Sequence, residues 1–328
     1  MIRSLFVVCL TSAALAAVPA AAQTRSAAAP EKAFDIVLER AASTAPGTYV
    51  LSGDALQPTT PHVPVVIQAD LLRGAEKPTR TVRVPVAIGT EVAADAIVRL
   101  RVVTASGSPR AVGDAQGSGQ AGHVRLVHEF TLSPGEYEIQ AVVGHRSAAG
   151  LIASIAKKRL SVPDVWKGPM AVTPVIIGDA VLAGERKGAQ PFTFGAATLS
   201  PAVKSQFDQK AEINIGFRVY NWGADSSKPE EAKPDLTVEY AFFEKLRAKT
   251  RFFNKMKPQE LDAETLGKTF DPATGMVAAG MRIPLVAFPF GTFDMRVRIT
   301  DNRTKQTSEQ HVLFEVVPPG GQQAASRR

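Results

Sequence analysis

A predicted β-hairpin near the C-terminus constrains the fold of this chain more than any other stretch. After Gly291, apolar and polar side chains alternate over residues 292–300, a polar turn follows at 301–305, and a second apolar run covers 311–317. Alternation with a period of two on both sides of a turn is typical of antiparallel strands with one buried face. The sequence therefore predicts an antiparallel sheet that covers a hydrophobic core with one face.

The same pattern occurs once more, earlier in the chain. Gly135 is followed two residues later by Tyr137, as Gly291 is by Phe293, and in both places an alternating run, a turn and a second strand end in Val-Pro. Two copies of one ending indicate two copies of one domain. Because proline has no amide proton for a strand ladder, the boundary between the copies is predicted at Pro163.

Short strand-like runs, separated by Gly and Pro clusters, fill both predicted domains. A chain of 328 residues with 45% hydrophobic residues is long enough for two such cores. Strands of this kind are typical of Greek-key sandwiches. The predicted fold is therefore all-β, with two tandem immunoglobulin- or fibronectin-like β-sandwiches over residues 48–163 and 164–318 and a short N-terminal helix. The strands are expected at residues 49–51, 64–71, 81–88, 96–104, 124–132, 136–143, 151–162, 170–177, 211–220, 236–243, 251–256, 276–284, 292–300 and 311–317.

The N-terminus is predicted to be a secretory signal peptide, residues 1–22. Arg3 precedes an apolar run over residues 5–18, and small residues lead to a cleavage site after Ala22. The run is too short for a membrane span, so no span is expected after cleavage, and we expect the mature protein in the periplasm or outside a bacterial cell. Cys9 is the one cysteine and leaves with this peptide, which excludes disulfides and thiol chemistry; lipidation of Cys9 is the less favoured alternative.

Two further segments flank the predicted domains. Residues 23–47 are expected to form an alanine-rich spacer and one amphipathic helix over 31–42, whose apolar residues recur at helical spacing. This helix face either packs against the first domain or docks a partner. Residues 319–328 are predicted to be a disordered tail because of their composition.

Six basic residues form the one uneven stretch of charge in the sequence. The formal net charge is +7, a mild excess that favours anionic surfaces but predicts no nucleic-acid binding. On a hairpin over residues 239–257, each strand could present its basic residues on one face. The strip is either a solvated sheet face that deters edge pairing or a groove for an anionic polymer or lipid head group. Its members are Lys245, Arg247, Lys249, Arg251, Lys255 and Lys257.

The sequence predicts no catalytic, cofactor-binding or metal-binding residues. A GxGxxG string at residues 117–122 precedes a predicted strand rather than the helix that would bind a pyrophosphate. The five histidines do not have zinc-site spacing, and a GxSxG nucleophile motif is missing. Two tryptophans are candidate aromatic contacts. Trp166, at the predicted boundary, either packs between the domains or serves as a ligand platform, and Trp222 follows a predicted strand.

Several short motifs resemble the C-terminal β-region of secreted "VWFA-related" proteins of Acidobacteria. The resemblance is carried by Gly135 with Tyr137, Val162-Pro163-Asp164, the apolar strand at 170–177, Tyr220-Asn221 and the hairpin at 291–317. It implies a secreted tandem β-sandwich. Those proteins also carry a von Willebrand A domain with an Asp-x-Ser-x-Ser metal site, and because the motif is missing here, metal-dependent adhesion does not carry over.

These observations predict an exported, non-catalytic interaction or structural module of the cell envelope, whose partner is an envelope protein or an anionic glycan or lipid. The alternative is a carbohydrate-binding accessory protein or a glycoside-active enzyme, which two convergent carboxylates or exposed coplanar aromatic rings near Trp222 would favour. A chaperone-like pilus or secretion component is a third possibility, which rests on fold analogy alone.

Overall fold

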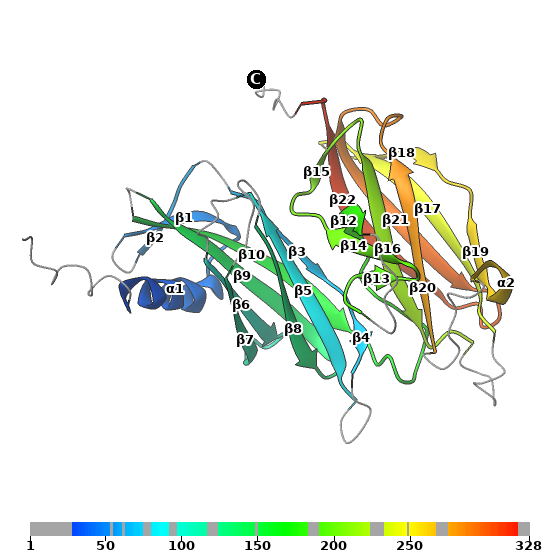
Figure 1. Ribbon diagram of the computed structural model, residues 1–328, viewed down its shortest axis with the longest axis horizontal. Coiled ribbons are helices and arrows are strands. Elements are labelled where there is room, and N and C mark those ends of the chain that lie inside the picture. Colours follow the sequence, from blue (N-terminus) through cyan, green and yellow to red (C-terminus); the bar gives the residue numbers. More distant parts are fainter. Residues whose placement is uncertain are drawn as a thin grey trace, which may run out of the picture.

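The computed structural model is all-β, with one short N-terminal helix (Figure 1). It describes residues 28–52, 55–60, 63–74, 80–91, 97–116, 124–147, 150–182, 190–223, 233–247, 249–266 and 275–320. The predicted signal peptide, the GxGxxG string at 117–122 and the predicted tail beyond Gly320 lie outside the described residues.

The N-terminal helix α1 (Ala28–Ala41) packs on the first sheet, as one of its two predicted roles requires. Phe34, Val37 and Leu38 are buried against strand residues such as Val142. Glycine allows the close approach of this helix to the sheet, because a Cβ added at Gly144 would lie 2.5 Å from the Phe34 ring. The helical spacing in the sequence thus reflects a buried face.

The N-terminal half of the chain, residues 28–162, forms two antiparallel sheets. Sheet 1 has the order β2-β1-β10-β9-β6-β7, and in sheet 2 the central strand β5 pairs with β3 and β4 on one side and with β8 on the other. The strands are β1 (Gly47–Ser52), β2 (Ala55–Pro58), β3 (Val65–Ala69), β4 (Leu72–Arg73), β5 (Val82–Thr90), β6 (Ile97–Thr104), β7 (Pro109–Gln116), β8 (Val124–Leu132), β9 (Gly135–Ser147) and β10 (Gly150–Val162).

The C-terminal half, residues 171–317, also forms two sheets. Sheet 3 has the order β11-β16-β12-β14-β13 with β20 on β16, and sheet 4 has the order β15-β22-β21-β17-β18 with β19 on β17. A helical turn, α2 (Ala263–Leu266), follows β19. The strands are β11 (Ala171–Val172), β12 (Ile176–Leu182), β13 (Thr193–Phe194), β14 (Ala197–Pro201), β15 (Gln206–Asp208), β16 (Glu212–Tyr220), β17 (Asp235–Lys245), β18 (Thr250–Lys255), β19 (Gln259–Asp262), β20 (Met276–Pro284), β21 (Gly291–Asp301) and β22 (Thr307–Val317).

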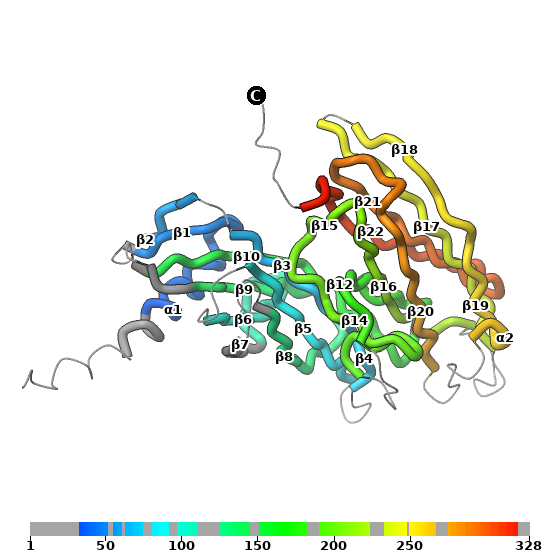
Figure 2. Tube along the Cα trace, turned by 45° about the horizontal axis from the view of Figure 1, so that its top comes forward, coloured from blue at the N-terminus to red at the C-terminus, as the bar shows by residue number. Residues whose placement is uncertain are grey.

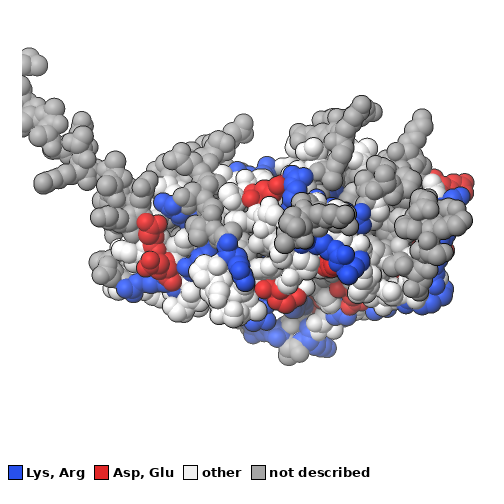
Figure 3. All heavy atoms as spheres, turned by 90° about the horizontal axis from the view of Figure 1, so that it is seen from below, with Lys and Arg blue, Asp and Glu red and all other residues white. Residues whose placement is uncertain are grey.

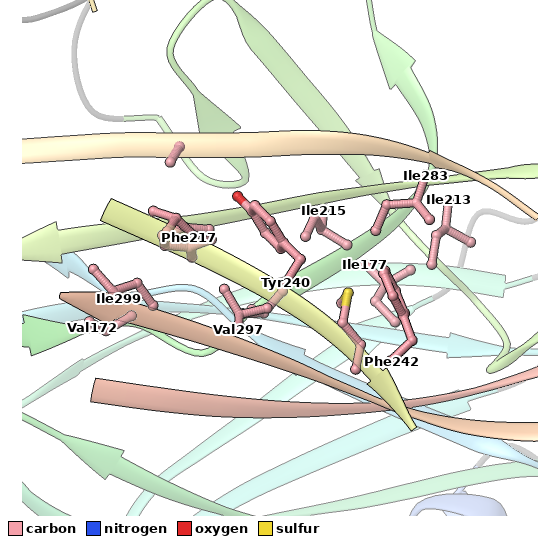
Figure 4. Close-up of a cluster of buried hydrophobic side chains, with 14 of the residues drawn as sticks. Val172, Ile177, Ile213, Ile215, Phe217, Tyr240, Phe242, Ile283, Val297 and Ile299 are labelled. Atoms are coloured by element: carbon pink, nitrogen blue, oxygen red, sulfur yellow. The ribbon is translucent and has the colours of Figure 1, made fainter. Parts of the chain in front are cut away.

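Two hydrophobic cores lie between these sheets. Sheets 1 and 2 enclose the first core, to which Ala171 and Tyr220 of the C-terminal half also contribute. Sheets 3 and 4 enclose the second, where Phe217 on β16 faces Tyr240 on β17 and Val297 on β21 (Figure 4). Both hairpins that carry the repeated sequence pattern supply alternate residues to a core, as predicted.

The order of the strands is repeated between the two halves. In sheet 2, β5 pairs with β3 and then β4 on one side and with β8 on the other, and in sheet 3, β16 pairs in the same way with β11 and then β12 and with β20. The order β10-β9-β6-β7 in sheet 1 corresponds to β22-β21-β17-β18 in sheet 4. Each closing hairpin begins at a glycine with positive φ, 156° at Gly135 and 147° at Gly291. These glycines pair with Val162 and Val316, which lie close to the Val-Pro endings. The division of the chain near Pro163 stays a prediction.

All fourteen expected strands lie on observed ones, but the one expected at 170–177 is divided into β11 and β12. The division occurs at Thr173 and Pro174, where proline has no N–H for the ladder and the Thr173 hydroxyl instead accepts a bond from the Arg218 amide (2.9 Å). The strands β2, β4, β7, β13, β14, β15 and β19 were not predicted. Most of them have too few residues to show a period of two.

The two halves meet through the outer faces of sheets 2 and 3. Ala87 of sheet 2 packs with Ile176 and Phe194 of sheet 3, and a Cβ at Gly89 would lie 2.3 Å from the Val203 backbone. Figure 2 shows β4 and β5 beside β14. The Gln68 side chain pairs with the main chain of Ile177, donating to its carbonyl (2.8 Å) and accepting from its amide (2.7 Å).

A buried ion pair crosses this interface. The Asp70 and Arg218 side chains are fully buried, and Arg218 binds the carboxylate through Nε (3.2 Å) and Nη2 (2.8 Å). Each nitrogen of the guanidinium and both oxygens of the carboxylate have a hydrogen-bond partner. Arg218 donates to the carbonyls of Thr193 and Gln190, and Asp70 accepts from the amide of Phe192. A fully paired charge of this kind is tolerated in a protein interior, whereas an unpaired one is not.

We therefore expect Asp70→Ala to lower the free energy of unfolding by about 3–5 kcal/mol, because it leaves a buried guanidinium without its carboxylate. The double variant Asp70→Leu with Arg218→Met is expected to lose less than the single variant. Urea titration of the wild type, of Asp70→Ala and of the double variant measures how much free energy of unfolding each variant loses. As a control, Arg282→Ala removes an exposed pair with Glu212 and should change stability by at most about 1 kcal/mol. A double variant less stable than Asp70→Ala would contradict this prediction.

Candidate functional site: a cationic cleft between the two halves

A cleft of about 620 Å³ lies where the two halves and their connecting segment meet. Its N-terminal wall is formed by β3 and β10, and its C-terminal wall by β12, the segment around 202–205 and β22. The connecting residues 163–170 contribute to the lining between these walls. We call this site the cleft.

Basic residues outnumber acidic ones in the lining of the cleft. Lys158, Arg159, Lys167 and Lys204 are among the residues that line it. Arg159 and Lys167 are exposed to solvent, whereas Lys204 lies 3.7 Å from the carboxylate of Glu91. On the face seen in Figure 3, positive and negative groups are interspersed. Among the described residues that line the cleft, four are lysine or arginine and one is aspartate.

Asp164 is the one carboxylate among the described residues that line the cleft. Desolvation disfavours its charged form, but the amides of Trp166 and Lys167 and the Arg80 guanidinium outweigh this effect, so the pKa of Asp164 lies below its ordinary value. The carboxylate is therefore charged and engaged in bonds that fix the connecting segment. It is the one acidic residue in the described lining, and Glu91 outside the lining lies beside Lys204.

Lys158 connects the two N-terminal sheets at the cleft wall. Its Nζ donates to the carbonyl of Ile67 on β3 (3.0 Å). Desolvation lowers the pKa of the Lys158 ammonium to about 8, so the group is still largely charged at neutral pH. The bond holds β10 against β3 and places one positive charge deep in the wall.

Two strand edges are open along the cleft. β1 pairs with β10 only at residues 151–155, and β15 pairs with β22 only at 315–317. Within the described residues, the rest of each strand has a neighbour on one side only, β9 for β10 and β21 for β22. Residues 158–161 and 310–313 of these open edges line the cleft.

Apolar side chains complete the lining. Met170, Val172 and Val175 extend from the second core to the cleft with 7–9% of their surface exposed. Leu313 on the open edge of β22 is 53% exposed. A ligand that combines negative charge with apolar groups would therefore find partners for both.

The predicted basic strip lies elsewhere, on and around the β17–β18 hairpin. A β-bulge at Phe253 shifts the register, so that Lys255 pairs with Ala241 whereas Arg251 pairs with Glu244. Positions 241 and 244 lie on opposite faces of β17, so the expectation that each strand presents its basic residues on one face does not hold for β18. Arg251 also forms an ion pair with Glu244. Lys245, Arg247, Lys249, Arg251, Lys255 and Lys257 are all exposed, and their role as a binding strip stays a prediction.

Neither tryptophan is among the residues that line the cleft. Trp166 packs against the first core under the Arg73 guanidinium, which lies 4.9 Å from the centre of its ring. Trp222 belongs to the second core and is 8% exposed. Packing of Trp166 between the two domains stays a prediction, and Trp222 has little surface to offer a ligand.

Sequence reasoning did not find the cleft. Its basic residues come from β10, the connecting segment, the loop after β14 and β22. Lys158 and Arg159 are adjacent in the sequence, whereas Lys167, Lys204 and His311 are far from them and from one another. Lys158 gave one weak signal, because it lies in a strand with many apolar residues. Among the described residues, no cluster of three or more His, Cys, Asp or Glu side chains could hold a metal ion.

Comparison with known proteins leaves the family of this chain open. No family model and no curated protein matches the sequence. Among solved structures, a DUF4785 family protein from Legionella pneumophila is similar at 11% identity and a TM-score of 0.24, over 76% of this chain and 57% of its own. The Bacteroides uniformis β-glucuronidase is 10% identical with a TM-score of 0.24, and the match covers 70% of this chain and 26% of the glucuronidase. Trypsin-activated α-2-macroglobulin from Escherichia coli is 11% identical with a TM-score of 0.21, and the match covers 74% of this chain and 15% of the macroglobulin. TM-scores below 0.5 do not establish a shared fold.

The lowered pKa of Lys158 predicts a pH dependence of stability. Between pH 8 and 10.5 the unfolded chain keeps a proton that folded Lys158 has released, so the contribution of this residue to stability rises with pH. The free energy of unfolding of the wild type minus that of Lys158→Met should therefore increase from pH 7 to pH 10 in urea titrations. Lys157→Met, one residue away, is the matched control; an equal increase for both variants would contradict the prediction.

Proposed function

We propose that this protein is an exported, non-catalytic interaction module of the cell envelope and that the cleft is its binding site for an anionic partner. The observation that carries this proposal is the combination of four lysine and arginine side chains with an apolar lining and two open strand edges in one cleft. Binding energy in such a site comes from charge pairing at the rim and from apolar contact inside.

The fold is part of the proposal. Two antiparallel sheets around each core and the same strand order in both halves support two tandem immunoglobulin- or fibronectin-like β-sandwiches. The same hairpins carry the resemblance to the β-region of the Acidobacteria proteins, which remains a proposal. The basic and apolar composition of residues 1–22 supports export. Within the described part of the chain, no helix is both long and apolar enough to cross a membrane.

The rival function is carbohydrate binding or glycoside hydrolysis. Glycosidases place two carboxyl groups on either side of the scissile bond. Among the described residues that line the cleft, Asp164 is the one carboxylate, and it is bonded to Arg80 and to two backbone amides. The lining therefore favours binding over hydrolysis.

Two double charge reversals test the proposal against the basic strip. Arg159→Glu with Lys167→Glu changes two exposed residues of the cleft, and Lys249→Glu with Lys255→Glu changes two exposed residues of the strip by the same net charge. We expect the cleft variant to lose salt-sensitive retention on an anionic matrix such as immobilised polyglutamate, because charge pairing is local. The strip variant should elute close to the wild type.

Elution of the cleft variant at the wild-type salt concentration would overturn the proposal. Loss of retention in the strip variant alone would move the binding site to Lys245–Lys257, as the sequence hypothesis has it. Circular dichroism of both variants, together with thermal unfolding, checks that the reversals leave the fold intact.

A further inference from the structure

We infer that the cleft binds an extended acidic peptide segment of a partner protein by adding it as a strand to the open edge of β22. The inference rests on the proposed function and deepens it, since it names the chemical class of the partner and the main-chain groups that hold it. Strand addition to an exposed sheet edge is a general mode of peptide recognition, in which backbone hydrogen bonds supply affinity and alternate side chains supply specificity.

The hydrogen bonds of β15 show which main-chain groups of β22 point away from β21. The amide of Glu315 donates to the Ser205 carbonyl (2.8 Å), and the carbonyl of Val317 accepts from the Gln209 amide (3.0 Å). Main-chain groups of a strand alternate between its two edges, so the odd-numbered residues of β22 direct their N–H and C=O outward. His311 and Leu313 therefore present theirs to the edge that borders the cleft.

At one end of β22, its outward edge is already paired with another strand. β15 runs parallel to β22 and pairs with residues 315–317, where it covers the outward groups. Residues 310–313, immediately before this segment, line the cleft. A peptide that pairs with these four residues would extend the line of β15 along the edge of β22 by about 13 Å, at about 3.3 Å per residue.

β22 is a better acceptor than the open edge of β10 or than β3, the edge strand of sheet 2 that also lines the cleft. The outward carbonyl of Ile67 on β3 already accepts a bond from Lys158. The open part of β10 presents polar residues, Arg159 and Ser161, and the Ser161 hydroxyl donates to Glu136. Beside β22, by contrast, lie the exposed Leu313 and the apolar residues that extend from the second core.

These surroundings define the peptide. Residues of one parity in an added strand would cover Met170, Val172 and Val175, which favours apolar side chains there. The cleft that would hold the peptide is also lined by four lysine and arginine residues, which favours glutamate or aspartate at the alternate positions. A peptide with alternating acidic and apolar residues fits both requirements. A polysaccharide would satisfy the charge but has no N–H and C=O groups at the two-residue spacing of the edge.

A labelled seven-residue peptide of alternating glutamate and valine is the probe, and its dissociation constant for the full chain is measured by fluorescence anisotropy. Leu313→Pro removes one outward N–H, which β21 does not use, and should weaken binding about five- to tenfold through loss of one hydrogen bond. Ser161→Pro makes the same change on the open edge of β10 and should leave the dissociation constant within about twofold of the wild type.

Two N-methylated forms of the peptide test the pairing without altering the protein. One is methylated at the glutamate amides and the other at the valine amides. A strand held along one edge uses only one of these sets, so one form should lose binding and the other should keep it. This asymmetry does not depend on the stability of any variant, and thermal unfolding checks both proline variants for folding.

The outcomes separate the inference from the proposed function. Equal effects of the two methylated forms, or a loss caused by Ser161→Pro rather than Leu313→Pro, would overturn strand addition to β22. Binding of polygalacturonate that the cleft charge reversal abolishes, without binding of the peptide, would overturn the peptide inference and leave the proposed function standing. If neither the peptide nor polygalacturonate binds and the charge reversal does not change retention on the anionic matrix, both the peptide inference and the proposed function are overturned.

Discussion

The buried pair of Asp70 and Arg218 is the interaction on which the arrangement of the two halves depends. Each charge comes from a different half, and neither could be buried alone without a large loss of solvation. Asp70 lies in the break between β3 and β4, and Arg218 lies opposite the corresponding break between β11 and β12, since its carbonyl accepts from the Thr173 amide. The two halves are thus joined where the first strand of sheet 2 and the first strand of sheet 3 are each interrupted, between β3 and β4 and between β11 and β12.

The cleft follows from this junction. Bonds from Gln68 to Ile177 and from Lys158 to Ile67 fix β3 to its neighbours on both sides, so the two walls that face each other are held by paired polar groups. A site whose walls are already in place loses less conformational entropy when a ligand binds. The open strand edges, in contrast, keep main-chain donors and acceptors available.

A feature of this structure could be predicted from the sequence where its pattern involves only neighbouring residues. The alternation in β5, β9 and β21 needs only neighbouring residues, and it identified the strands, their hairpins and the repeat. Arg218 interrupts an apolar strand, where alternation suggests an exposed side chain, and only the other half of the chain explains its burial. The bulge at Phe253 is one extra residue, yet it moves Arg251 to the opposite face from Lys255. The cleft combines distant segments, which no local pattern records.

The position of the open edges reflects an asymmetry within the repeat. β10 and β22 are equivalent closing strands, but β1 covers the beginning of β10 whereas β15 covers the end of β22. The uncovered lengths therefore fall at opposite ends of the two strands, at residues 156–162 and 307–314. Packing of sheet 2 on sheet 3 brings the uncovered parts of β10 and β22 to one cleft, and the two strands contribute different groups to it. β10 supplies cations beside its edge, and β22 supplies an apolar edge with outward main-chain groups. The hairpin that most constrains the fold from sequence is in this way also the part of the chain that offers a binding edge.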